Sequence, residues 1–177
     1  LRTEMFLETE NNLKNNIDSK IFYLEAPTGS GKSNIAFNLS FQLLKKSDYC
    51  RKIFYVYPFN TLVEQNMNSM EKIFGQNEVI MSNIAVVNSI TPYKVKNSSN
   101  ANRYEDEKYA IENYQKILLD RQFLNYPIVL STHITLFDTM FGRSKDSTFG
   151  FHQLCHSVIV LDEIQSYNNN KWGAMIS

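Results

Sequence analysis

The chain has 177 residues, of which 43% are hydrophobic, and it carries equal numbers of basic and acidic residues, 18 of each. This length can bury the core of one domain, and the low glycine and proline content excludes a disordered or fibrous chain. The formal charge of zero excludes a protein that binds nucleic acid mainly through a basic surface. Any such contact would depend on backbone amides and a few placed side chains.

The cysteines and the first residues of the chain indicate where the protein works. Cys50 and Cys155 lie far apart in the sequence, which does not fit a disulfide framework and favours a reducing compartment. Residues 1–16 contain acids and amides instead of the apolar segment of a signal peptide, and no stretch is long enough to span a bilayer. We therefore expect a cytoplasmic protein that is monomeric and has no membrane partner.

The first part of the chain predicts a helix, a strand and a second helix. Apolar residues at helical spacing predict an amphipathic helix over residues 3–17. The apolar run 21–24 predicts a buried strand. After a glycine-containing loop at 26–33, helical spacing resumes and continues to about Lys46.

Four more strands are predicted, because short apolar runs recur along the rest of the chain at 53–57, 84–87, 127–130 and 158–161. The run 53–57 is apolar at both alternating positions, which is typical of a parallel strand that is buried on both faces. Between the strands the patterns predict three helices and two polar loops. The helices are a capped helix from Thr61–Glu64 to Phe74 ended by Gly75, a helix over 104–123, and a helix that follows Ser131-Thr132 and ends at Gly142; the loops are 88–102 and 143–150.

Strands and helices therefore alternate through the whole sequence. This order predicts an α/β fold with three layers, in which a mostly parallel sheet has helices on both faces. The sequence contains no internal repeat and no linker that would divide it, so residues 1–177 are expected to belong to one domain.

The loop Ala26-Pro27-Thr28-Gly29-Ser30-Gly31-Lys32-Ser33 joins a predicted strand to a predicted helix, which is the context of a phosphate-binding loop. Its two glycines permit positive φ, so that backbone N–H groups can surround an anion at the positive end of the helix. Lys32 would reach the β- and γ-phosphates of ATP, and the Ser33 hydroxyl would bind Mg²⁺. Ala26 stands where the common form has glycine. The alternative is a glycine–serine turn between unrelated elements.

Asp162 and Glu163 directly follow the last predicted strand. Ligands of parallel α/β sheets bind at the carboxyl ends of the strands, so the phosphate-binding loop and these acids should share one edge. Asp162 would then hold Mg²⁺ opposite Ser33, and Glu163 would deprotonate the attacking water. An acidic pair alone could be a helix cap, but together with the loop it predicts an ATPase.

Other polar residues predict contacts with nucleic acid. Asn60, Thr61 and Gln65 open the helix after the second strand, and Ser131 and Thr132 follow the fourth. Helix N-termini with hydroxyl groups are natural partners of a nucleic-acid phosphate, although ordinary capping explains the same residues.

The spacing of His152, Cys155 and His156 could suggest a metal site. A metal ion needs three or four ligands, and no companion cluster lies near these residues in the sequence, so we expect no zinc site.

With these motifs in place, the chain resembles the helicase part of the CRISPR-associated helicase–nuclease of type I systems, a superfamily 2 helicase. The resemblance involves residues 26–33, 57–66, 127–142 and 161–167. Its more specific parts are Pro58-Phe59-Asn60-Thr61-Leu62, the approach 121–127 to the fourth strand, and Asp162-Glu163-Ile164-Gln165-Ser166-Tyr167. It implies the first RecA-like domain of a motor that uses ATP to move along single-stranded DNA. Its partner would be an RNA-guided surveillance complex in prokaryotic antiviral defence.

The resemblance also implies roles for individual residues. Lys32 matches the phosphate-loop lysine, Ser33 and Asp162 the magnesium residues, and Glu163 the catalytic glutamate. Gln165 matches the residue that links the nucleotide state to the moving parts. The segments 58–65, beginning with Pro58, and 131–132 match the motifs that contact the nucleic-acid strand.

Three parts of that family have no counterpart in the sequence. They are a nuclease domain, a second RecA-like domain with arginines for the ATP site, and a strand that lies between the phosphate-loop strand and the Asp–Glu strand. We therefore expect a partial domain whose sheet has a central gap and whose own turnover is low. The alternatives are a motor with another DNA or RNA client, a phosphotransferase with the same loop, and a non-catalytic nucleotide-dependent binding module.

Overall fold

The computed structural model describes residues 2–27, 29–87, 115–120, 122–143 and 145–167. Its centre is a four-stranded sheet in the order β2-β3-β1-β4, in which every neighbouring pair is parallel. The strands are β1 (Lys52–Tyr57), β2 (Ile84–Val87), β3 (Ile128–Thr132) and β4 (Ser157–Leu161). The α/β fold with a parallel sheet is confirmed, and four of the five predicted strands form.

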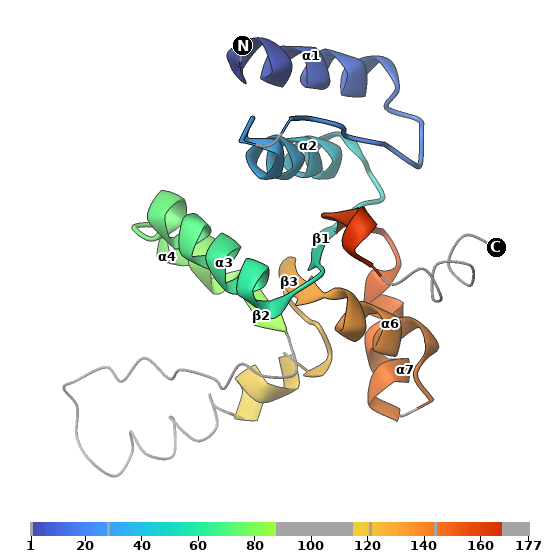
Figure 1. Cartoon of the computed structure of the whole chain (residues 1–177). Coiled ribbons are helices and arrows are strands. Elements are labelled where there is room, and N and C mark those ends of the chain that lie inside the picture. The colour runs from blue at the N-terminus through green and yellow to red at the C-terminus, as the bar shows by residue number, and fades with distance from the viewer. Residues whose placement is uncertain (1, 28, 88–114, 121, 144, 168–177) are drawn as a thin grey trace.

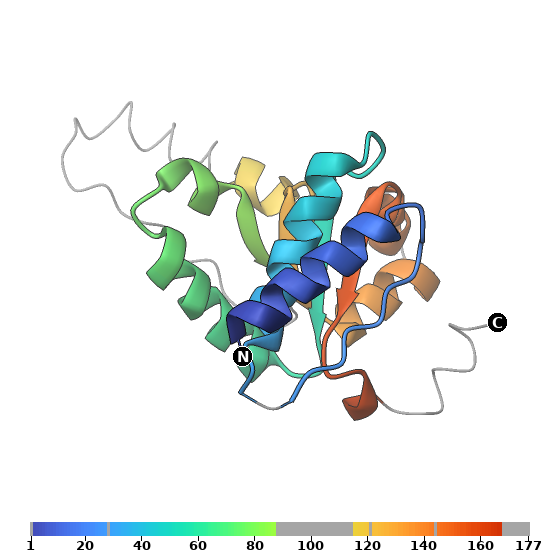
Figure 2. The ribbon, with the colours of Figure 1, turned by 90° about the horizontal axis from the view of Figure 1, so that it is seen from above.

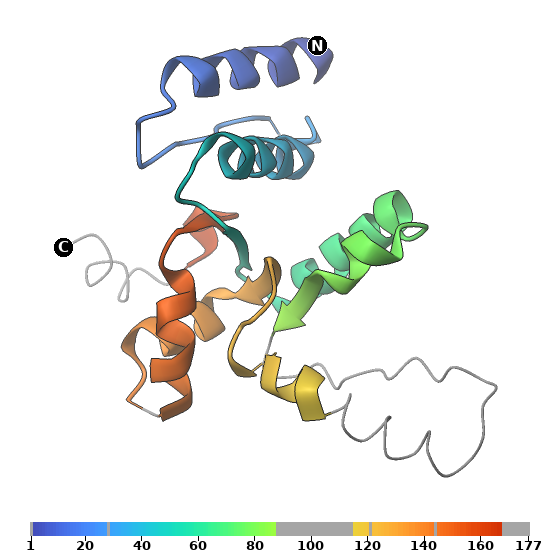
Figure 3. The ribbon, with the colours of Figure 1, turned by 180° about the vertical axis from the view of Figure 1, so that it is seen from behind.

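Helices cover both faces of this sheet (Figures 1 and 3). One face carries α2 (Lys32–Lys46), α3 (Asn60–Phe74) and α4 (Glu78–Ser82). The other carries α6 (His133–Phe141) and the 3₁₀ turn η1 (His152–Leu154), while α7 (Lys145–Phe151) packs on α6. Helix α1 (Arg2–Asn15) lies on the outer side of α2, as Figure 2 shows from above.

The alternation of side chains along β1 produces the two cores of the domain. Tyr55 and Tyr57 point into the core under α2 and α3, whereas Phe54 and Val56 point into the core under α6. Because Ile53 to Tyr57 are all at most 2% exposed, this strand is buried on both faces, as its composition predicts.

The predicted strand at 21–24 is wrong. Its residues form neither a helix nor a strand, and Ile21 and Tyr23 are 89% and 79% exposed. A strand requires a neighbour for its backbone groups, and among the described residues none of the four strands pairs with this segment. The segment therefore stays outside the sheet.

Three smaller expectations also differ from the structure. The capping box at Thr61 is wrong, because α3 begins at Asn60 after Phe59 without a side-chain cap. Ser131 and Thr132 end β3 instead of opening the next helix, although Thr132 is the residue before α6. Most of 143–150, predicted as a loop, belongs to α7, which packing against α6 stabilises despite its polar sequence.

Two predicted segments fall wholly or partly outside the described residues. The polar loop 88–102 lies outside them, and of the helix 104–123 only 115–120 and 122 are described as helical. Within the described chain, no helix combines the length and the apolar character that crossing a membrane requires.

Candidate nucleotide site

The loop before α2 has the backbone shape that its glycines predict. Gly29 has φ of 77° and Gly31 has φ of 93°, and Gly31 is the N-cap of α2. No heavy atom lies within 4 Å of the position that a Cβ would take at either glycine. The Ser30 N–H donates to the Pro27 carbonyl oxygen at 3.1 Å. Thr28, also predicted to bind nucleotide, lies outside the described residues.

The structure brings this loop together with the acidic pair. Lys32 Nζ donates to Glu163 Oε1 at 2.8 Å and lies 3.8 Å from Asp162 Oδ1. The residues meet although they are about 130 positions apart, because α2 packs against β4 and its first residue lies near the carboxyl end of that strand. The expectation that both motifs share one edge of the sheet is therefore confirmed in position.

Asp162 is held in place by three contacts. Its N–H donates to the Val56 carbonyl oxygen at 2.9 Å, and its Oδ1 accepts from the Glu163 N–H at 3.0 Å. Its Oδ2 lies 3.5 Å from the Tyr55 hydroxyl. Burial is the main cause that raises the pKa of Tyr55, and the Asp162 charge adds to it. The Tyr55 hydroxyl thus lies beside Asp162, one of the two predicted magnesium residues.

Glu163 makes two side-chain hydrogen bonds that keep it charged. One comes from Lys32 and the other from Gln165 Nε2, which donates to Glu163 Oε2. The hydrogen bond with Lys32 is the main reason why the pKa of Glu163 is lowered, and the same bond raises the pKa of Lys32. Glu163, Gln165 and Lys32 therefore form a charged, hydrogen-bonded group at neutral pH.

These residues fit a magnesium-bound triphosphate. Ser30 Oγ is buried and has no hydrogen-bond partner among the described residues, so it offers a free polar atom inside the loop. The open space at both glycines leaves room for an anion close to the backbone. The hydroxyl of Ser33 and the carboxylate of Asp162 are the oxygen ligands that Mg²⁺ prefers.

A comparison with protein families matches residues 9–177 to the DEAD/DEAH box helicases. The chain belongs to this family. Membership establishes a helicase domain that binds and hydrolyses ATP and acts on nucleic acid. No curated protein matches the chain. The four letters in the family name spell Asp-Glu-Ala-Asp or Asp-Glu-Ala-His, and this helicase has Asp162-Glu163-Ile164-Gln165.

The predicted nucleic-acid residues of this helicase domain lie near the same edge, since Tyr57 and Thr132 are partners in the register of β1 and β3. Their side chains differ in exposure. Thr61 and Gln65 are exposed on α3, whereas Pro58 is buried.

The hydroxyls after β3 are less accessible. Ser131 Oγ donates to the Val87 carbonyl oxygen at 2.6 Å, and Thr132 Oγ1 lies 3.4 Å from Thr135 Oγ1. Ser131 and Thr132 are only 3% and 4% exposed, so a strand could reach them only through the backbone. Asn60 is half-buried, and its Oδ1 has no partner in the described part of the chain.

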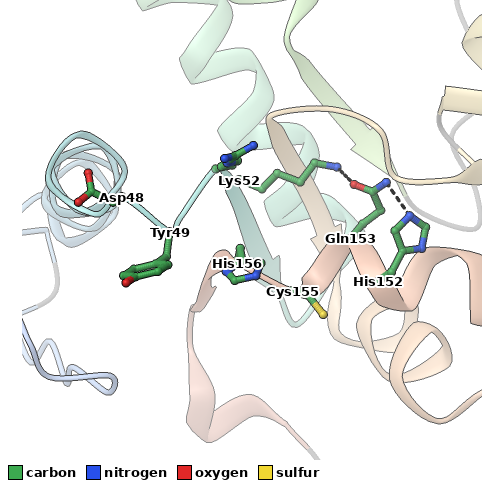
Figure 4. A pocket seen from close by; sticks show the side chains of 8 residues that line it. Asp48, Tyr49, Lys52, His152, Gln153, Cys155 and His156 are labelled. Carbon is green, nitrogen blue, oxygen red and sulfur yellow. Dashed lines mark hydrogen bonds between the residues drawn. The ribbon is translucent and has the colours of Figure 1, made fainter.

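The histidine–cysteine cluster lies at the opposite edge of the helicase domain, where β1 and β4 begin. Figure 4 shows His152 beside Gln153, with Cys155 and His156 on the other side of an open hollow. Lys52 Nζ donates to Gln153 and to the Leu124 carbonyl oxygen. No three His, Cys, Asp or Glu side chains converge as metal ligands in the described chain.

Sequence reasoning missed two residues of the nucleotide site. Tyr55 was predicted only as part of a buried strand, although its position near the carboxyl end of β1 could have indicated a hydroxyl at the ligand edge. Tyr167 was noted only within a motif, yet its hydroxyl donates to the Val56 carbonyl oxygen at 3.0 Å. The signal for Tyr167 is a polar aromatic residue that comes directly after a catalytic motif.

Proposed function

We propose that this helicase domain is the first RecA-like domain of a motor that moves along single-stranded DNA in type I CRISPR interference. The observation that carries the proposal is the position of Lys32, whose ammonium lies within 4 Å of both Asp162 and Glu163. The stretches 57–66 and 161–167, which the domain shares with the CRISPR-associated helicase–nuclease, support the choice of client.

The loop residues Pro27 to Ser33, Thr28 included, would bind the phosphates of ATP through backbone N–H groups and Lys32. Ser33 and Asp162 would hold the magnesium ion, which when bound would neutralise phosphate charge. The hydrogen bond that the Tyr55 hydroxyl donates to Asp162 would hold this carboxylate in its orientation.

Glu163 would act as the general base that takes a proton from water. In the structure the Glu163 carboxylate accepts hydrogen bonds from Lys32 and Gln165. Phosphate groups of ATP compete for the Lys32 ammonium, and this competition would free one carboxylate oxygen for water. Gln165 would keep its hydrogen bond with the other carboxylate oxygen of Glu163. A movement of Glu163 would therefore also move the segment that carries Gln165.

The nucleic-acid strand would run along the edge where α3 and α6 begin. The exposed side chains of Thr61 and Gln65 support direct contacts there, and the first turns of both helices offer backbone N–H groups for phosphates. The less exposed residues at this edge would support the exposed ones from inside the domain; they are Pro58, Asn60, Ser131 and Thr132.

The experiment compares ATP hydrolysis by the intact protein with no nucleic acid, single-stranded DNA, duplex DNA and single-stranded RNA of one sequence. We expect single-stranded DNA to raise the rate most. Gln65→Ala should raise the DNA concentration needed for half-maximal stimulation, whereas Asn68→Ala, an exposed position on the same helix, should not. Stimulation by none of the strands would contradict a nucleic-acid motor, and a preference for RNA would indicate another client.

The proposed partner requires a separate measurement. A purified RNA-guided surveillance complex bound to its DNA target should retain the intact protein on a column, and the same complex without target should not. Equal retention in both cases, or none in either, would contradict the CRISPR role while leaving the ATPase activity intact.

A further inference from the structure

The geometry points to Tyr167 as a positioning residue for Asp162 and Glu163, one that also connects their loop to the start of α6. Tyr167 follows the short turn η2 (Ile164–Ser166) and is only 4% exposed. The first part of this inference depends on the ATP hydrolysis that family membership establishes. The connection to α6 depends on the proposed function.

The first argument concerns the loop from Asp162 to Tyr167, because both of its end residues donate a hydrogen bond to the same carbonyl group. The Val56 carbonyl oxygen accepts the Asp162 N–H at 2.9 Å and the Tyr167 hydroxyl at 3.0 Å. Val56 is fully buried in the central strand β1 and cannot move without the sheet. The loop that carries Glu163 is therefore fixed to the most rigid part of the domain at its first and last residues.

The second argument is that the backbone conformation of Glu163 must be fixed by the residues around it. Its φ of 49° lies in the left-handed region, which is unfavourable for a residue with a side chain. Backbone strain of this kind persists only where the surrounding structure determines the conformation. The hydrogen bond from the Glu163 N–H to Asp162 Oδ1 fixes one side, and Tyr167 fixes the far end of the loop.

The third argument concerns the ring of Tyr167. Its centroid lies 5.1 Å from that of His133, which is the first residue of α6 and directly follows Thr132. His133 Nδ1 is buried and has no hydrogen-bond partner in the described part of the chain, and the rings of the two residues pack against each other. A displacement of either the loop or the start of α6 would be passed on through this contact.

The test measures steady-state ATP hydrolysis by the intact protein, with and without nucleic acid. Tyr167→Phe keeps the ring but removes the bond to Val56, and we expect kcat to fall about tenfold or more because Glu163 is less well placed. KM for ATP should change less than about twofold, since the loop that binds phosphate is untouched. The matched control is Tyr49→Phe, which alters an exposed tyrosine at the opposite edge and should leave kcat unchanged.

A kcat of Tyr167→Phe equal to that of Tyr49→Phe, in a folded protein, would overturn the positioning role. His133→Leu tests the connection: the ratio of stimulated to unstimulated rates should fall, and an unchanged ratio would overturn it. This variant tests the connection to α6 even if Tyr167→Phe does not fold. If no nucleic acid stimulates the wild type, the proposed function fails, but the kcat comparison still tests Tyr167.

Discussion

At the scale of single residues, the candidate site is held together by the ion pair between Lys32 and Glu163. The pKa of Glu163 lies below its ordinary value of 4.5 and that of Lys32 above its ordinary value of 10.5. The stabilisation from Glu163 is therefore complete above pH 4.5 and is lost as the pH falls through its lowered pKa. The stabilisation from Lys32 is complete below pH 10.5 and is lost as the pH rises through its raised pKa. Both side chains are about one third exposed, 31% and 37%, so the pair contributes at most about 1 kcal/mol.

The first prediction follows from this pH window. Near pH 7, Glu163→Gln should lower the free energy of unfolding of the nucleotide-free protein by less than about 1 kcal/mol. In acid, below the lowered pKa of Glu163, the difference from the wild type should vanish. Urea unfolding at both pH values measures it, and a difference that does not change with pH would contradict the ion pair. A weak pair of this kind can yield to the phosphates of ATP.

The second prediction concerns Gly31. With φ of 93°, Gly31→Ala should cost about 1–2 kcal/mol of stability and weaken ATP binding, because the backbone cradle must change shape. Gly150→Ala is the control: its Cβ would lie 3.1 Å from Thr139 and 3.2 Å from Leu124, so it perturbs packing remote from the loop. Thermal unfolding measures the stability of both variants, and ATP titration should show lost affinity only for Gly31→Ala. Equal ATP affinities of the two variants would contradict the role of the loop backbone in binding phosphate.

At the scale of elements, sequence patterns correctly predicted those strands and helices that their own buried side chains define. The alternation in β1 and the apolar faces of α2 and α3 were predicted because buried side chains define them directly. The pattern at 21–24 failed because a strand exists only with a partner, and composition does not tell whether one is present. α7 was missed because its packing on α6 outweighs a polar sequence.

The third prediction follows from the unpaired segment 21–24. Its backbone N–H groups should exchange with solvent far faster than those of residues 53–57, which lie in the centre of the sheet. Hydrogen exchange followed by mass spectrometry on this chain measures both segments in one experiment. Equal protection of 21–24 and 53–57 would contradict the structure.

At the scale of the whole molecule, the parallel sheet is what assembles the site. All four strands point the same way, so the segments after β1, β3 and β4 meet the loop before α2 at one edge. The meeting of Lys32 with Asp162 was predicted on the assumption that 21–24 is a parallel strand; this strand does not form, and the packing of α2 against β4 brings the loop to that edge instead. The contacts of Tyr55 and Tyr167 were not predictable, because they depend on which strands are neighbours and on their register.

The central claim is that the glycine loop and the acidic pair form one ATP-hydrolysing site. The most direct measurement compares ATP binding and hydrolysis by the intact wild type, Glu163→Gln and the control Glu71→Gln, an exposed glutamate of α3. We predict that Glu163→Gln binds ATP like the wild type but hydrolyses it about 10²–10⁴-fold more slowly, while Glu71→Gln behaves like the wild type. Hydrolysis by Glu163→Gln at the wild-type rate would contradict the account.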